Sequence, residues 1–215
     1  MSLNNLKSEI VYLIRNSDVF TIAQRNVTTT TTGAIALSGA SSYILNVTNI
    51  KNIRSLTIDT VSLKYGKDYT LDLDHLDGTI KCKIDFTTPQ TGDMVIQYDA
   101  GSDKIFTDFP RGDLTINSYP RIAIEEISKN SEAFSLGGSD FISNIMFTIV
   151  VYAENQEFIE QVLSLIESTM KTNAKNFYYI PFIKPTGRGP IMRSEDRSQT
   201  LMHKNTDFIG MFEVT

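Results

Sequence analysis

The sequence predicts an α+β fold: a mixed or antiparallel sheet packed with two helices, plus an inserted all-β, sandwich-like domain. Three patterns predict it. Residues 141–153 alternate like a strand and lead directly into a helical stripe over residues 156–172. A second helical stripe covers residues 3–16. Between Gly33 and Gly101, short alternating runs are separated by turn residues at even spacing, which is typical of a small sandwich or barrel.

These patterns divide the chain into two parts. Residues 1–26 and 105–215 form a discontinuous α+β domain, and residues 27–104 form the inserted β module. The length of 215 residues suits one large domain or two small ones. The composition, 41% hydrophobic and 21% charged, is that of an ordinary globular protein with enough apolar residues for a core.

The first helix is predicted from a narrow apolar stripe. Its members follow helical spacing: Leu3, Leu6, Ile10, Leu13 and Ile14. We expect the stripe to pack against the sheet, because the polar face is not basic as in helices that bind membrane surfaces. Residues 17–32 include a threonine run, and β-branched residues favour extended backbone. This segment is therefore predicted to be an extended connector or edge strand without a site.

The β module is predicted to contain several short strands. They cover residues 35–37, 43–47, 53–61, 69–73, 79–86 and 94–98. Asp77-Gly78 is a strong hairpin signal, because glycine adopts positive φ readily, and residues 89–93 are a predicted turn. In the strand over residues 79–86, the alternation places Ile80, Cys82, Ile84 and Phe86 inward.

The strand over residues 141–153 is predicted to lie at the centre of its sheet. Ile145, Phe147, Ile149 and Val151 point to one face, and Met146, Val150 and Tyr152 to the other. Asn155 is the predicted N-cap of the helix that follows, and Lys171 and Asn173 close it. The apolar stripe of this helix is Phe158, Ile159, Val162, Leu163, Leu165, Ile166 and Met170.

The remaining elements are short strands joined by loops. Strands are predicted over residues 105–109, 121–127 and 207–214, with an apolar, aromatic run over residues 177–183. Residues 128–140 are a predicted loop whose flexible point is Gly137-Gly138. Residues 184–199 are a predicted long loop, and long loops in compact domains are usually functional or disordered.

The candidate interface residues lie in these two loops. They are Lys184, Arg188, Arg193 and Arg197 in the long loop, with Gly137 and Gly138 in the other. One interpretation is an arm that docks on a neighbouring subunit or on a negatively charged partner. The other is a solvated loop that only connects two strands. The sequence leaves both open.

Composition excludes several classes of protein. The formal net charge of −5 argues against a dedicated nucleic-acid binder. The single cysteine, Cys82, excludes a disulfide framework within the chain. The N-terminal residues lack the pattern of a signal peptide, and no apolar run is long enough to span a membrane. We therefore expect a protein that stays in a cytoplasm or is built into something assembled there.

No catalytic, metal or cofactor site is predicted. His75 and His203, the two histidines, lack neighbours at metal-ligand spacing. Asp72, Asp74 and Asp77 do not match a calcium-binding loop, because Leu76 and Lys83 stand where ligands are needed. The sequence GRGP at residues 187–190 lacks the lysine and hydroxyl of a phosphate loop. We expect the protein not to be an enzyme.

Outside the insert, the order of elements is helix, strand, strand, helix and further strands. The segments are NNLKSEIVYLIRN, YPRIAIEEI, NIMFTIVVYAENQEFIEQVLSLIESTM and FIGMFEV. Over residues 3–20 and 105–215, this pattern resembles the tail terminator (tail completion) family of long-tailed bacteriophages. The insert, with LKYGKDYTLDLDHLDGTIKCKIDFTTPQTGDMVIQYDAG, is similar to small β-sandwich modules that recur in phage structural proteins.

The resemblance implies a structural virion protein of the tail and neck, assembled in the host cytoplasm. Such a subunit forms a ring, usually hexameric, at the head-proximal end of the tail, ends growth of the tail tube and joins the tail to the head connector. The implied partners are further copies of the chain, the tail tube protein, head–tail connector or neck proteins and, as an additional candidate, the tail sheath. Genomic DNA would pass through the lumen without specific binding, and no membrane is involved.

Two alternatives stay open. Another neck protein, a head–tail adaptor or stopper, belongs to the same class. A carbohydrate-binding protein belongs to a different one, with Tyr43, Tyr65, Tyr69 and Tyr98 as candidate contact residues. The alternation of these tyrosines favours buried or half-buried positions in the β module.

Overall fold

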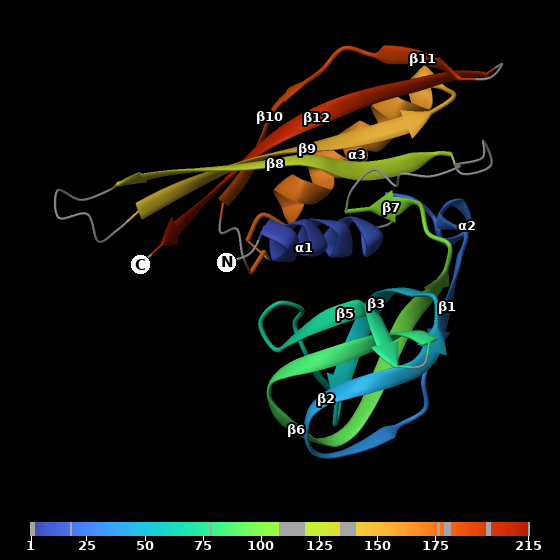
Figure 1. Ribbon diagram of the computed structural model, residues 1–215, viewed down its shortest axis with the longest axis vertical. Helices are drawn as coiled ribbons and strands as arrows, with labels where there is room; N and C mark the ends of the chain where they lie inside the picture. The colour runs from blue at the N-terminus through green and yellow to red at the C-terminus, as the bar shows by residue number, and fades with distance from the viewer. Residues whose placement is uncertain are drawn as a thin grey trace. The chain divides into compact units, whose positions relative to one another are not determined.

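The computed structural model describes residues 3–17, 19–77, 79–107, 119–133, 141–175, 177–178, 182–196 and 199–214. It is mostly β, with few helices, and contains two sheets (Figure 1). The chain divides into two compact units. Unit 1 comprises Met1–Phe20 and Lys104–Thr215, and unit 2 comprises Thr21–Asp103.

Unit 1 is built on a mixed sheet. Its strands are β7 (Ile105–Phe106), β8 (Arg121–Ala133), β9 (Phe141–Ala153), β10 (Phe182–Arg188), β11 (Met192–Asp196) and β12 (Gln199–Val214). The order is β10-β12-β9-β8-β7, and β11 also pairs with β12. Only the β7–β8 pair is parallel among these ladders. The predicted central position of β9, between β8 and β12, is confirmed.

Two helices belong to the core of unit 1. They are α1 (Leu3–Arg15) and α3 (Gln156–Thr172). The buried residues of both helices share one apolar cluster with alternate residues of β9. Asn155 is the N-cap of α3, as predicted, and its side-chain oxygen accepts hydrogen bonds from the backbone N–H groups of Glu157 and Phe158. Leu165 departs from the predicted stripe, because it lies on the exposed side of α3.

The two faces of β9 differ strongly in burial. Ile145, Phe147, Ile149 and Val151 are buried on the face that meets the helices, as their alternation predicts. On the opposite face, the side chain of Met146 is 55% exposed. We call this second side of the sheet the open face.

Unit 2 contains one short helix and one antiparallel sheet. Its elements are α2 (Ile22–Arg25), β1 (Val27–Thr31), β2 (Ile35–Thr48), β3 (Ile50–Ile58), β4 (Val61–Ser62), β5 (Tyr69–Asp77) and β6 (Thr79–Gly101). The sheet curls into a half-barrel around its own apolar cluster (Figure 1). This is a single sheet, whereas the sequence predicted a sandwich-like arrangement.

The length of β6 explains this difference. It is a single strand of 23 residues, where the sequence predicted two strands separated by a turn over residues 89–93. Its first half pairs with β2 and β5, and its second half with β1 and β3. Register shifts in the β2 ladder accompany the bend, and Gly92, in β6, has φ +125° close to Asp59. The turn residues thus bend the strand without ending it.

Other boundaries also differ from the prediction. The predicted loop over residues 184–199 contains most of β10 and all of β11, and β8 continues to Ala133 through the first six residues of the loop predicted over residues 128–140. Proline and glycine favour loops locally, but proline is tolerated in a strand at the edge of a sheet. The connector over residues 17–32 includes α2, which begins with a capping box formed by Thr21 and Gln24. Ile80 is exposed, not inward.

Candidate functional site

The structure separates the residues of the predicted interface. Lys184 lies in β10 and Arg193 in β11, and both are exposed. Arg188 is the last residue of β10. Arg197, Gly137 and Gly138 lie outside the described residues. The predicted docking arm is thus, over residues 184–188 and 192–196, part of the sheet.

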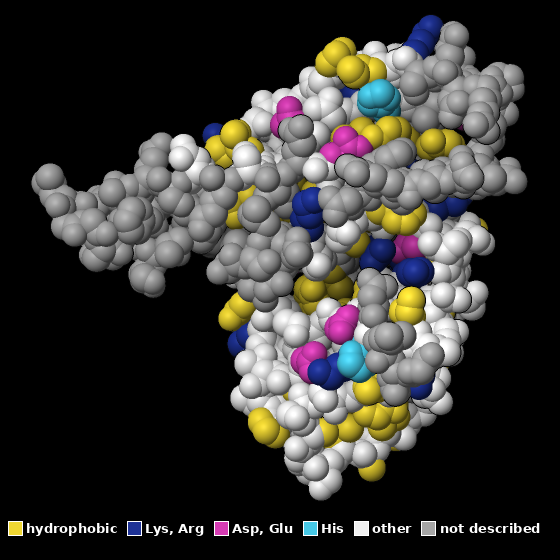
Figure 2. All heavy atoms as spheres, viewed as in Figure 1, with side chains coloured by type: hydrophobic (Ala, Val, Ile, Leu, Met, Phe, Trp, Pro, Cys, Tyr) yellow, Lys and Arg dark blue, Asp and Glu magenta, His cyan; other side chains and the backbone are white. Residues whose placement is uncertain are grey.

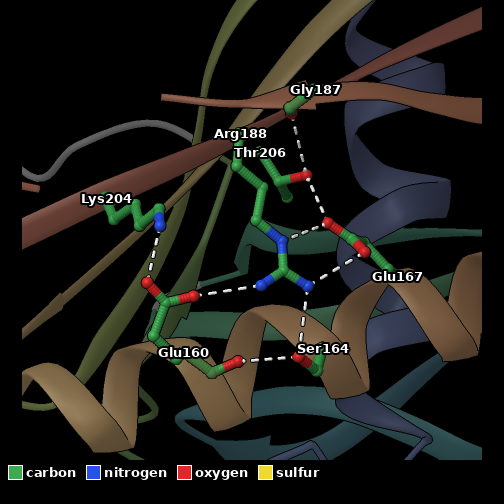
Figure 3. Close-up of polar contacts among 7 residues, drawn as sticks. All are labelled: Glu160, Ser164, Glu167, Gly187, Arg188, Lys204 and Thr206. Carbon is green, nitrogen blue, oxygen red and sulfur yellow. Dashed lines mark hydrogen bonds and ion pairs between the residues drawn. The ribbon is translucent and has the colours of Figure 1, made fainter. Parts of the chain in front are cut away.

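Arg188 binds two carboxylates of α3 (Figure 3). Its Nε and Nη2 atoms donate to the two oxygens of Glu167 at 2.7 and 3.0 Å, in a bidentate pair. Its Nη1 atom donates to Glu160 at 3.0 Å. The guanidinium therefore joins the end of β10 to two turns of the helix.

A second set of contacts surrounds this pair. Lys204 of β12 binds the other oxygen of Glu160, and the hydroxyl of Thr206 donates to Glu167 at 3.0 Å. The hydroxyl of Ser164 accepts from Nη2 of Arg188 at 3.1 Å and donates to the backbone carbonyl of Glu160 at 2.9 Å. We call these six residues the Arg188 cluster: Glu160, Ser164, Glu167, Arg188, Lys204 and Thr206 (Figure 3).

The charges of the Arg188 cluster stabilise one another. The hydrogen bond from Lys204 lowers the pKa of Glu160, and the hydrogen bond from Arg188 lowers the pKa of Glu167. The hydrogen bond to Glu167 in turn raises the pKa of Arg188. Each group is thus held in its charged form, which is the arrangement expected of a structural ion-pair network.

The Arg188 cluster fastens β10 and β12 to α3, so Arg188 is already engaged within its own chain. Lys184 and Arg193 remain as exposed cations of the predicted interface. The helical half of the cluster has a sequence signal that could have been used: Glu160, Ser164 and Glu167 follow helical spacing and share one face of α3. The strand residues of the cluster give no such signal, because the position of Arg188 opposite Thr206 depends on how β10 pairs with β12.

Replacing Arg188 with glutamine is expected to lower the free energy of unfolding of unit 1 by about 1 kcal/mol. The cluster is partly exposed, so solvent screens it, and the loss should shrink as salt is raised to about 1 M. Urea unfolding followed by circular dichroism at low and high salt measures both effects. Arg193→Gln, which removes an exposed arginine from β11, is the matched control and should change little. An equal loss for both variants would contradict this role of the cluster.

The open face of unit 1 carries a groove of about 900 Å³. Met146 and Met192 supply exposed apolar surface, Val150 is buried beneath it, and His203 also lines the groove. The carboxylates have local partners: Asp207 accepts from Thr148 and from Asn205, each at 2.9 Å, and Glu125 accepts from the hydroxyl of Tyr152. Figure 2 shows hydrophobic side chains reaching the surface among polar ones on this sheet. Such a surface suits contact with another protein.

A buried ion-pair cluster in unit 2 was missed by the sequence analysis. Arg25, at the end of α2, is fully buried and binds Asp103 through Nε at 3.0 Å and Nη2 at 2.9 Å. Its Nη1 atom donates to Asp99 at 2.8 Å. Asp99 also accepts from the hydroxyl of Thr29 at 2.6 Å and from Nε of Arg54 at 2.7 Å. We call Arg25, Asp99 and Asp103 the Arg25 clasp.

The clasp keeps Arg25 and Asp99 charged despite burial. Burial acts to lower the pKa of Arg25, but hydrogen bonds and attraction to Asp103 and Asp99 outweigh it and leave that pKa raised. Burial acts to raise the pKa of Asp99, but hydrogen bonds from Arg54 and Thr29 and the charge of Arg25 outweigh it and leave that pKa lowered. No sequence pattern points to this cluster, because Asp99 and Asp103 lie more than seventy residues from Arg25.

The tyrosines considered as carbohydrate contacts are mostly in the core of unit 2. Tyr69 and Tyr98 are buried, as the alternation predicts, and Tyr43 and Tyr65 pack against the same cluster. Among the residues that the structure describes, no group of histidine, cysteine and acidic side chains could hold a metal ion. In the same residues, no helix is long and apolar enough to cross a membrane.

Comparisons with known proteins leave the chain without an assigned relative. No protein-family model matches the sequence, and no curated protein matches it.

Proposed function

We propose that this chain is a structural virion protein, a subunit of a ring at the head-proximal end of a phage tail. The ring ends growth of the tail tube and joins the tail to the head connector. Unit 1 supports this proposal through its order of elements, α1, β8, β9, α3 and then β10 to β12, which is the order that resembles the tail terminator family.

The open face of unit 1 is the observation that carries the proposal. Strand register places Phe182, Met192 and Met146 on this face, and their side chains are 44%, 51% and 55% exposed. The alternation in β9 places Val150 and Tyr152 beside them. A sheet that faces only water carries mostly polar residues on that face. The open face mixes these exposed apolar side chains with polar ones such as Thr148 and Asp207, and such exposed apolar groups suit a surface that binds other proteins.

The proposed mechanism is steric and interfacial. Copies of the chain pack on the last ring of the tail tube, stop its polymerisation and offer a new surface to the neck proteins. The tail sheath is an additional candidate partner. The acidic balance of the chain suits a lumen through which DNA slides without tight binding. A continuous Lys/Arg lining of the lumen, mapped in an assembled ring, would contradict this last point.

The test measures the oligomeric state of the full chain at high concentration, by mass and by electron microscopy, with and without tail tubes. We expect rings that bind the tube ends. The double variant Met146→Glu, Met192→Glu should abolish assembly and tube binding, because it places charge on the open face. The control is Leu165→Glu, which adds one negative charge, half of that added by the double variant, at an exposed position on α3. Both variants should retain the unfolding midpoint of the unmodified chain.

Two outcomes would sink the proposal: a persistent monomer that does not bind tail tubes, or assembly unaffected by the double variant. Deleting the gene for this chain from the phage distinguishes the classes of function. Normal heads with overlong tails would favour the terminator. Normal virions that fail to adsorb would favour the carbohydrate-binding alternative.

A further inference from the structure

We infer that unit 2 opens and closes as a separate cooperative unit, and that closure of the Arg25 clasp stabilises unit 1 through the chain connection. The dependence runs in one direction: the stability of unit 1 depends on closure of unit 2, whereas the stability of unit 2 does not depend on unit 1. This inference is independent of the proposed role in a phage tail.

The clasp lies where the chain enters and leaves unit 2. Arg25 and Asp103 stand close to the two ends of the unit. Beside them, β1 pairs with the end of β6, with Val27 opposite Gly101, and the N–H of Ser102 donates to the carbonyl of Asn26 at 3.2 Å. A Cβ atom on Gly101 would lie 2.4 Å from that carbonyl oxygen, so the two segments approach closely. The clasp therefore holds together two points that are far apart in the sequence.

Unit 1 has a contact that depends on this proximity. Nη2 of Arg15, in α1, donates to the carbonyl of Ile105, in β7, at 2.6 Å across 90 residues of sequence. Leu6, Ile10 and Ile14 of α1 share the apolar cluster of unit 1 with Ile105. When unit 2 is open, docking of α1 on β7 must close a loop of 90 residues. When the clasp is closed, only the residues from Arg15 to Arg25 and from Asp103 to Ile105 remain free, about a dozen in all. The lower entropy cost of loop closure then raises the equilibrium constant for docking roughly 20-fold.

In the part of the chain that the structure describes, unit 2 has a core of its own. Its apolar cluster consists of residues between Leu37 and Tyr98, all within unit 2. Arg25, Asp99 and Asp103 also belong to unit 2. Arg54 on β3, which donates to Asp99, belongs to unit 2 as well.

The chain contains its own reporter of unit 2 opening. Cys82 is the only cysteine and is fully buried in β6. Burial, with a smaller effect of Asp72, raises the pKa of its thiol to about 12, so the folded state has almost no reactive thiolate. Labelling of Cys82 by a thiol reagent therefore reports the open fraction of unit 2 in the intact chain.

The experiment combines two measurements on the full chain: the rate of Cys82 labelling, and hydrogen exchange of α1 followed by mass spectrometry. Arg25→Met should raise Cys82 labelling at least 100-fold and exchange in α1 by roughly 10- to 30-fold. Asp103→Asn, which keeps a polar side chain of the same size in the clasp but removes its charge, serves as the milder variant if Arg25→Met does not fold. The matched control is Ile14→Ala in α1. It should raise exchange in α1 and change Cys82 labelling less than twofold.

Either of two results would overturn the inference. Ile14→Ala raising Cys82 labelling in parallel with exchange in α1 would mean that the two units open together. Clasp variants that raise Cys82 labelling without changing exchange in α1 would mean that the connection transmits no stability. Both results are independent of whether the chain forms rings.

Discussion

Replacing Arg25 with alanine is expected to lower the free energy of unfolding of unit 2 by about 3–5 kcal/mol. The substitution leaves two carboxylates near the end of β6 without their buried cation. Asp99 keeps Arg54 and Thr29 as partners, whereas Asp103 loses a bidentate one. A buried charge without its partner costs much more than the intact pair contributes, which is why a large loss is expected.

Urea unfolding of the full chain, followed by Cys82 labelling at each concentration, isolates the unit 2 transition. Arg54→Ala is the matched control, because it removes one ion pair to Asp99 from a partly exposed position and should cost about 1 kcal/mol or less. The lowered pKa of Asp99 means that its contribution is present above the unfolded pKa, about 4. The contribution is lost as the pH falls through the folded value. A loss below about 1 kcal/mol for Arg25→Ala would show that the clasp is not a central support of unit 2.

Replacing Phe147 with alanine is expected to cost unit 1 about 3–5 kcal/mol. The ring of Phe147 is buried at the centre of β9 and stacks on the ring of Phe208 in β12, with centroids 5.2 Å apart. Both rings belong to the apolar cluster that contains α1 and α3. Removing the ring leaves a cavity between the sheet and the helices, which the surrounding side chains fill only in part.

Met146→Ala is the control for Phe147→Ala, because the neighbouring residue points to the open face. It should change the free energy of unfolding by less than about 0.5 kcal/mol. Circular dichroism during urea unfolding measures both variants. Similar losses at the two positions would mean that both faces of β9 are equally packed, and would contradict the assignment of an open face. The same variant at residue 146 also tests whether the open face contributes to stability before assembly.

The elements predicted well from the sequence are those set by local patterns. The strand β9 and the helix α3 follow from a change of period at Asn155, and the cap itself is formed by neighbours within three residues. Leu165 shows the limit of such a pattern, because helical spacing gives the direction of the buried stripe but not its width. In β6, Pro89 and Gly92 look like a turn locally, yet pairing with β2 carries the strand through them.

The site was less predictable, because its contacts join distant segments. Arg188 was a candidate interface residue within a predicted loop, but its partners on α3 could be found only from the register of β10 against β12. Arg25 lies in a segment where no site was expected, and its carboxylate partners, Asp99 within β6 and Asp103 just after it, are distant in the sequence. Long-range ion pairs leave no periodic trace in a sequence, unlike apolar faces.

The long strand β6 has a consequence for synthesis on the ribosome. It pairs directly with β1, β2, β3 and β5, and it is the last strand of unit 2 in the sequence. The four earlier strands therefore emerge into solution before the strand that joins them exists. Their backbone N–H and C=O groups cannot pair fully with β6 until residue 101 has left the exit tunnel. We therefore expect the nascent chain to bind chaperones most strongly just before β6 emerges.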